Sequence, residues 1–114
     1  MGGDIRLIYE MRIYTCLPGR MSALLKRFSD HTCALFEKHG MRQAGFFTTL
    51  AGESNNHLTY FLAWESLAER ETKWALFGRD PDWIRVRDAS ERDGPIIANV
   101  STQFLTPTAF SAVK

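Results

Sequence analysis

Several features that would identify a function directly are scarce or missing in this chain of 114 residues. No apolar run approaches the roughly 18 residues that a membrane span requires, and no signal-peptide core follows Met1. The two cysteines, Cys16 and Cys33, form no CxxC pair and have no histidine at metal-ligand spacing. The net charge of +1 gives no basic excess for a phosphate backbone. We therefore expect a cytoplasmic protein without a membrane span, a nucleic-acid partner, a metal or a cofactor.

Catalytic motifs are also missing. The chain has no glycine-rich phosphate loop, no GxSxG and no DxD pair, so phosphoryl transfer and serine-type hydrolysis have no support. Its three histidines, His31, His39 and His57, form no HxH or HxxxH pair, and we interpret each as structural. The sequence thus names no catalytic residue.

Hydrophobic periodicity is what the sequence does contain. Its 45% hydrophobic content is that of an ordinary globular domain. Alternating and three-and-four spacings predict an order of strand, helix, strand, strand, helix, strand. The expected strands are 7–16, 41–50, 57–65 and 96–105, and the expected helices are 21–39 and a two-piece region over 67–91.

Local signals support these boundaries. Gly40 is placed to end the first helix in a left-handed cap. Ser66 and Glu69 form a capping box, in which the serine accepts from the amide of Glu69 and the glutamate reaches back to the serine amide. We expect Gly78 to stop that helix and Asp80, followed by a proline, to cap the next piece.

This order predicts a ferredoxin-like α+β sandwich with a four-stranded antiparallel sheet. Strands 7–16 and 57–65 are expected at the centre of the sheet, because both are apolar on two faces. The domain should cover 7–107. Residues 1–6 are interpreted as a flexible segment or a remnant of an expression vector, and 108–114 as a tail.

Two-sided apolar strands need a second cover, because the helices reach only one sheet face. The uncovered face would expose residues such as Ile8, Tyr14 and Phe61, or their neighbours of opposite parity. A second copy packed sheet to sheet would cover it. At roughly 25 cal/mol per Å², several hundred Å² per subunit would stabilise the pair by on the order of ten kcal/mol before ordering costs. We therefore predict a homodimer.

A few charged residues interrupt the apolar pattern. Glu10 and Arg12 share one face of a central strand, which indicates either an ion pair in the sheet or dimer interface, or a polar group in a ligand pocket. Arg70 lies on the apolar stripe of the second helix and is expected to pair with Glu65 at the helix entry, or else to clamp an anion. Glu65 could also join the Glu10 network.

We also expect aromatic side chains to line an apolar cavity between helices and sheet. The candidate pocket or network residues combine these aromatic, charged and histidine side chains: Tyr9, Glu10, Arg12, His31, Trp64, Glu65, Arg70 and Trp83.

Together these motifs resemble a known family. The segments 9–14, 18–19 and 45–46, then Gly52, 55–56, 64–70, 80–83 and 105–107, follow the NIPSNAP pattern in order and spacing. The chain is similar to the short bacterial members. The resemblance implies a dimeric α+β barrel, and it implies no catalytic residues or substrate. Its superfamily includes small monooxygenases. The haem-degrading members among them use a histidine in the region of the second helix, and this chain has no histidine between Leu58 and Lys114.

Three functions remain open at this point. The first is a homodimeric barrel of undetermined role that binds a small apolar or aromatic molecule. The second is a cofactor-independent monooxygenase or isomerase, with catalysts drawn from Tyr9, Glu10, Arg12, His31, Glu65 and Arg70. The third is an interaction module without catalysis. The geometry of the pocket separates these alternatives.

Overall fold

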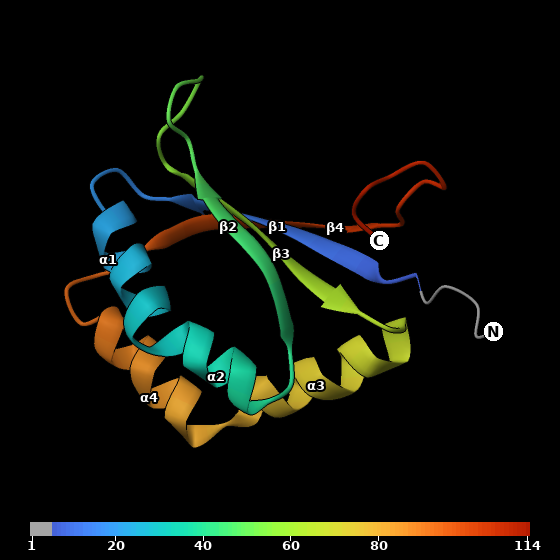
Figure 1. Cartoon of the computed structure of the whole chain (residues 1–114). Coiled ribbons are helices and arrows are strands. Elements are labelled where there is room, and N and C mark those ends of the chain that lie inside the picture. Colours follow the sequence, from blue (N-terminus) through green and yellow to red (C-terminus); the bar gives the residue numbers. More distant parts are fainter. Residues whose placement is uncertain (1–5) are drawn as a thin grey trace.

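The computed structural model describes residues 6–114 (Figure 1). The segment predicted over 1–6 therefore lies, apart from Arg6, outside the described residues. The strands are β1 (Ile8–Cys16), β2 (Arg42–Thr48), β3 (His57–Trp64) and β4 (Ile97–Leu105). The helices are α1 (Met21–Arg27), a π-helical segment η1 (Phe28–Thr32), α2 (Cys33–Lys38), α3 (Leu67–Arg79) and α4 (Pro81–Ser90).

The four strands form one antiparallel sheet in the order β2-β3-β1-β4. β1 and β3 are central, as the two-sided apolar pattern predicted, and β2 and β4 are the edges. Figure 1 shows the helices gathered on one side of the sheet. The α+β ferredoxin-like fold is confirmed.

The first helical region follows its prediction except in its middle. It begins at Met21, but five residues after Arg27 adopt the wider π-helical winding of η1 before α2 continues. Gly40 ends the region with a φ of 68°, the left-handed conformation that glycine adopts at no steric cost.

The caps around α3 and α4 depart from the prediction in detail. Ser66 Oγ accepts from the Glu69 amide at 3.0 Å, as expected, but the Glu69 carboxylate accepts from the amide of Glu65, not Ser66. Gly78 lies inside α3, so it does not stop the helix. Asp80 both follows α3 and caps α4, where its Oδ1 accepts from the amide two residues on at 2.8 Å.

Asp80 also joins α4 to the end of α2. Its Oδ2 lies 2.7 Å from Lys38 Nζ and 2.7 Å from His39 Nε2. These two bonds hold the pKa of Asp80 well below its usual value. The contact fixes the two helical regions to each other beneath the sheet.

Successive side chains of each strand point to opposite faces of the sheet, so even-numbered and odd-numbered residues of a strand lie on different faces. On β1 and β3 the residues facing the helices are buried: Glu10, Arg12, Tyr14, Cys16, Leu58, Tyr60, Leu62 and Trp64. Tyr14 therefore lies under the helices, and Ile8 packs against the same core. Of the residues expected on the uncovered face, Ile8 and Tyr14 do not lie there. The alternative holds for β1, because the neighbours of opposite parity, Tyr9, Met11 and Ile13, lie on that face. Phe61, which is opposite Met11, lies there as expected.

β4 is less covered than its clean alternation suggested. A register shift at Thr15/Cys16 separates its start from the rest of the strand, and Ile96 just before it is fully buried. Val100 and Phe104 lie on the helix side, opposite Tyr14 and Glu10, yet Phe104 is 46% exposed. The helices thus cover the sheet over β2, β3 and β1 and leave the side chains of β4 open.

Candidate functional site

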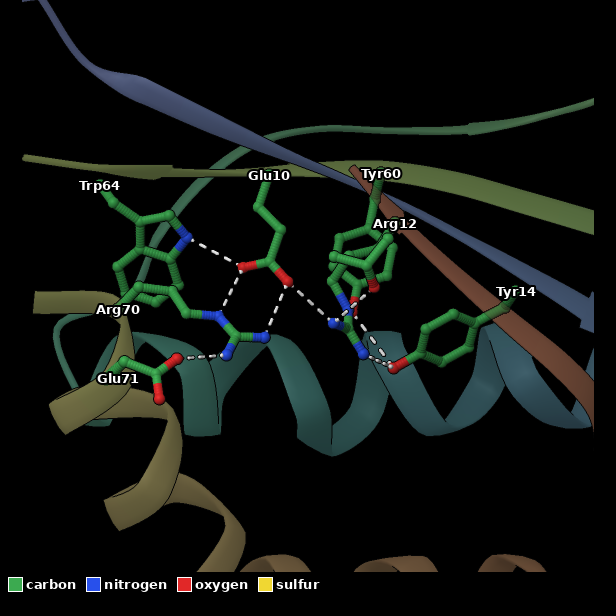
Figure 2. Close-up of polar contacts among 8 residues, drawn as sticks. Glu10, Arg12, Tyr14, Tyr60, Trp64, Arg70 and Glu71 are labelled. Carbon is green, nitrogen blue, oxygen red and sulfur yellow. Dashed lines mark hydrogen bonds and ion pairs between the residues drawn. The ribbon is translucent and has the colours of Figure 1, made fainter. Parts of the chain in front are cut away.

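The buried charge cluster centres on Glu10, which is 0% exposed (Figure 2). Its Oε2 accepts from Arg12 Nη1 at 2.9 Å and from Arg70 Nη2 at 3.1 Å. Its Oε1 accepts from Arg70 Nε at 3.1 Å and from Trp64 Nε1 at 3.0 Å. A carboxylate with four donors, two of them in a bidentate fork from one guanidinium, is fully satisfied in a buried position.

Arg12 extends the cluster toward β3 and β4. Its Nε donates to Tyr60 Oη at 2.8 Å, its Nη2 to Tyr14 Oη at 3.4 Å, and its Nη1 also to Thr102 Oγ1 at 3.3 Å. The Trp74 ring lies 4.3 Å from its guanidinium carbon, within cation–π distance. The guanidinium is thus enclosed by hydroxyl groups and an aromatic face.

The electrostatics keep these groups in one protonation state. Burial alone would raise the pKa of Glu10, but hydrogen bonds from Arg70 and Arg12 outweigh it and lower that pKa. Burial opposes the charge on Arg12, yet its tyrosine and carboxylate partners raise its pKa above the ordinary value. Burial raises the pKa of Tyr60. None of these groups is poised to exchange a proton near neutral pH.

The local chain explains how this cluster forms. The period of two places Glu10, Arg12 and Tyr14 on one face of β1, and the β1–β3 register puts Tyr60 directly opposite Arg12. The Ser66 cap starts α3 so that Arg70 points back over the end of β1 (Figure 2). The ion pair predicted for Glu10 and Arg12 is present within the chain, on the helix side of the sheet.

The pairing predicted for Arg70 was wrong. Its partners are Glu10 and, at 2.9 Å, Glu71, while Glu65 is exposed and contributes only its backbone amide to Glu69. A carboxylate 60 residues away outcompetes the nearby Glu65, because Glu10 is buried and must be compensated.

The other candidates lie in three separate places. Trp64 joins the cluster, as described. Tyr9 lies on the uncovered sheet face, in a hollow of about 460 Å³. His31 lines a different hollow, between η1 and α4. Trp83 packs against Phe77 and over the Arg27 guanidinium. The structure therefore does not bring the eight candidates into one pocket.

Sequence reasoning missed five partners of the cluster: Tyr14, Tyr60, Glu71, Trp74 and Thr102. The first two are the same-parity residues that flank and oppose Arg12, so the predicted pairing of central strands could have found them. Trp74 and Thr102 depend on tertiary packing. The expected aromatic cavity between helices and sheet is instead occupied in part by ring packing among Phe36, Trp74 and Phe77.

The hollow on the uncovered face is mostly apolar. Sheet residues and the C-terminal segment line it together: Tyr9, Ala44, Phe47, Phe61, Leu105, Thr106, Pro107, Ser111 and Val113. Its polar side chains are hydroxyl groups only. Such a surface can hold an apolar or aromatic group but offers no carboxylate or imidazole for acid–base chemistry.

Within residues 6–114, no helix is both long and apolar enough to cross a membrane. In the same part of the chain, no three His, Cys, Asp or Glu residues are grouped so that they could hold a metal ion.

The order of the elements and of the strands places the chain in the ferredoxin-like α+β class. Comparisons with known proteins identify its family within that class. The NIPSNAP family model matches residues 9–112, so the chain belongs to the NIPSNAP family. A NIPSNAP family protein of unknown function from Agrobacterium tumefaciens is 25% identical, with a TM-score of 0.86 and 98% and 97% of the two chains covered. An uncharacterised NIPSNAP-like domain protein from Burkholderia xenovorans is 23% identical, with a TM-score of 0.83 and coverage of 95% and 90%.

A more distant likeness shows the fold alone. A candidate antibiotic biosynthesis monooxygenase from Chloroflexus aurantiacus is 10% identical, with a TM-score of 0.58 and coverage of 95% and 99%. No curated protein matches the chain.

Proposed function

We propose that the chain forms a homodimer in which two uncovered sheet faces pack together, and that the resulting barrel binds a small, mostly apolar molecule. The observation that carries this proposal is the uncovered sheet face itself. Tyr9, Met11, Ile13 and Phe61 lie on it, on the two central strands, and Phe47 beside them is 57% exposed.

The dimer follows from the size and position of this apolar face. Central strands that expose aromatic and aliphatic side chains are rare on monomers, because such a patch favours association. Packing against an identical face removes it from water on both copies at once, and a twofold axis makes the surface self-complementary. The NIPSNAP resemblance independently implies this arrangement.

Ligand binding follows from the hollow on the same face. The cavity of about 460 Å³ lies within the size range of small-molecule sites. It is open in the single chain, and a second sheet packed across it would close it. Its lining favours an aromatic or aliphatic guest with at most one or two hydroxyl contacts, from Tyr9, Thr106 or Ser111.

The same geometry favours binding over catalysis. The charged catalysts considered from the sequence, Glu10, Arg12 and Arg70, lie on the opposite side of the sheet and are bonded to each other. In the hollow, the hydroxyl groups of Tyr9, Thr106 and Ser111 would lie beside an apolar guest, and its lining contains no carboxylate or imidazole. Of the catalysts considered from the sequence, Tyr9 is the one that lines this hollow.

The test combines assembly and binding. Phe61→Arg places a charge in the proposed interface, and Leu76→Arg, at a 47% exposed position on α3, is the matched control. We expect the wild type and the control to sediment as dimers and to enhance the fluorescence of the neutral probe N-phenyl-1-naphthylamine. Phe61→Arg should be monomeric and lose the enhancement.

Two outcomes would contradict the proposal in separate ways. A dimer that Phe61→Arg leaves intact would place the interface elsewhere. If Phe61→Arg disrupts the dimer but the wild-type dimer does not bind the probe, the result would support an interaction module and contradict the proposed ligand binding.

A further inference from the structure

Arg27 is a buried guanidinium that has no counter-ion among residues 6–114. The residue is 5% exposed, and its Nε is enclosed by protein with no hydrogen-bond acceptor. Its Nη1 donates to Ser90 Oγ at 3.2 Å, and no other hydrogen bond of its side chain is found within residues 6–114. Over the same residues it forms no ion pair. An unpaired buried charge is costly, and buried charges in proteins are as a rule paired or bound to a metal.

The side chain lines a hollow of about 510 Å³ between the α1–η1 junction and α4. Trp83 stacks under the guanidinium, whose carbon lies 5.3 Å from the ring centre. On the hollow's wall, Ala23, Val86 and Ala89 supply apolar surface. The site therefore combines one charged fork with room for a hydrocarbon group.

The other charges around the hollow leave Arg27 uncompensated. Lys26 pairs with Asp30 at 4.0 Å, and Arg85 pairs with Asp82 outside the hollow. Asp30 and Asp93 line the hollow but form no ion pair with Arg27, and Glu91 acts on it only at longer range. Burial lowers the pKa of Arg27, which reports the cost of holding this charge without a partner.

The backbone at the site is fixed by the π-helical segment. Phe28 begins η1 directly after Arg27, and Thr32 Oγ1 donates to the Arg27 carbonyl at 3.3 Å. This bond holds the turn from which the guanidinium projects. Sequence reasoning missed Arg27 because a lone arginine beside Leu24 and Phe28 looks like an edge residue of the apolar stripe.

We propose that Arg27 binds the carboxylate of a small organic acid whose apolar part lies against Ala23, Val86 and Ala89. A guanidinium matches a carboxylate in a planar, bidentate fork. Among the lysines and arginines that line the hollow in residues 6–114, Arg27 is the one without an ion pair, and two aspartates lie in the same lining. This balance of charges favours a monoanion over phosphate. This site lies in the helical layer, so it is independent of the dimer and of the hollow on the uncovered sheet face.

The probe is hexanoate, titrated into the full-length protein by calorimetry and followed in amide NMR spectra. We expect saturable binding, with shifts confined to η1 and α4. Arg27→Gln should weaken it by roughly tenfold or more, the loss of one charge-assisted pair. Arg87→Gln, on α4 but outside the lining of the hollow and with a 46% exposed side chain, should leave it unchanged.

A second variant separates binding from folding. Ala89→Trp fills the hollow from an exposed position and keeps Arg27, so it should abolish binding while the unfolding curve stays as in the wild type. The proposal is overturned if hexanoate does not bind, if it binds Arg27→Gln equally well, or if inorganic phosphate displaces it at equal concentration.

Discussion

Glu10→Gln tests whether the buried charge cluster holds the sheet to α3. The substitution keeps the shape of the side chain and removes the charge that two guanidiniums share. Removing one partner of a buried ion pair typically costs about 3–5 kcal/mol, because the remaining charge stays buried. Arg12 is 8% exposed, so this range applies. The loss is a large share of the roughly 5–15 kcal/mol that stabilises a domain.

The assay is urea unfolding at pH 7, followed by circular dichroism at one protein concentration, because a dimer's stability depends on concentration. The matched control is Glu71→Gln. Its carboxylate also pairs with Arg70 but is 75% exposed, so it should cost less than about 1 kcal/mol. If Glu10→Gln and Glu71→Gln shifted the free energy of unfolding by the same small amount, the reasoning about the cluster would be refuted.

The pH dependence gives a second check on Glu10. Its folded-state pKa is lowered, so the folded state binds fewer protons there than the unfolded state does. The stabilisation is therefore complete above the unfolded value of about 4.5 and is lost as the pH falls through the folded value. The difference in stability between wild type and Glu10→Gln should shrink as the pH falls below 4.5. A difference that stays constant would contradict the assignment.

Two further predictions concern the helix ends. Gly40→Ala should destabilise the protein by about 1–2 kcal/mol, because its φ of 68° disfavours a side chain. The control Gly78→Ala, in α3 with open space around it, should be neutral or stabilising. Equal effects of the two substitutions in thermal unfolding would contradict this prediction. Asp80→Asn should lower the melting temperature at pH 7, because it removes the negative charge that Lys38 and His39 share. Since the pKa of Asp80 is lowered in the folded state, the difference in melting temperature between wild type and Asp80→Asn should shrink below pH 3.8. A difference that grows there would contradict this prediction.

Local chemistry allowed much of the fold to be predicted. The position of Gly40, the Ser66 cap and the Asp80 cap depend on residues within a few positions, and each was found where the sequence placed it. The central position of β1 and β3 followed from their two-sided apolar pattern. The π-helical winding of η1 could not be predicted from the apolar pattern, because apolar spacing in a short helix hardly distinguishes the π-helical period from that of an α-helix.

The candidate site was predictable only in part. The spacing of Glu10 and Arg12 placed them on one face, but the choice of Arg70 as their third member depends on how α3 packs across β1. Nothing in the local sequence favours Glu10 over the nearby Glu65 as the partner of Arg70. The exposure of Phe104 also escaped prediction, since alternation on β4 shows two faces but not whether a helix reaches either one.

The proposed dimer, in which this NIPSNAP chain covers its apolar sheet face with a second copy, is tested by sedimentation equilibrium of the wild-type protein at micromolar concentration. We expect the wild type to have twice the chain mass of 13.0 kDa and Phe61→Arg to have the mass of a single chain. A wild-type protein that sediments at 13.0 kDa across that range would contradict it.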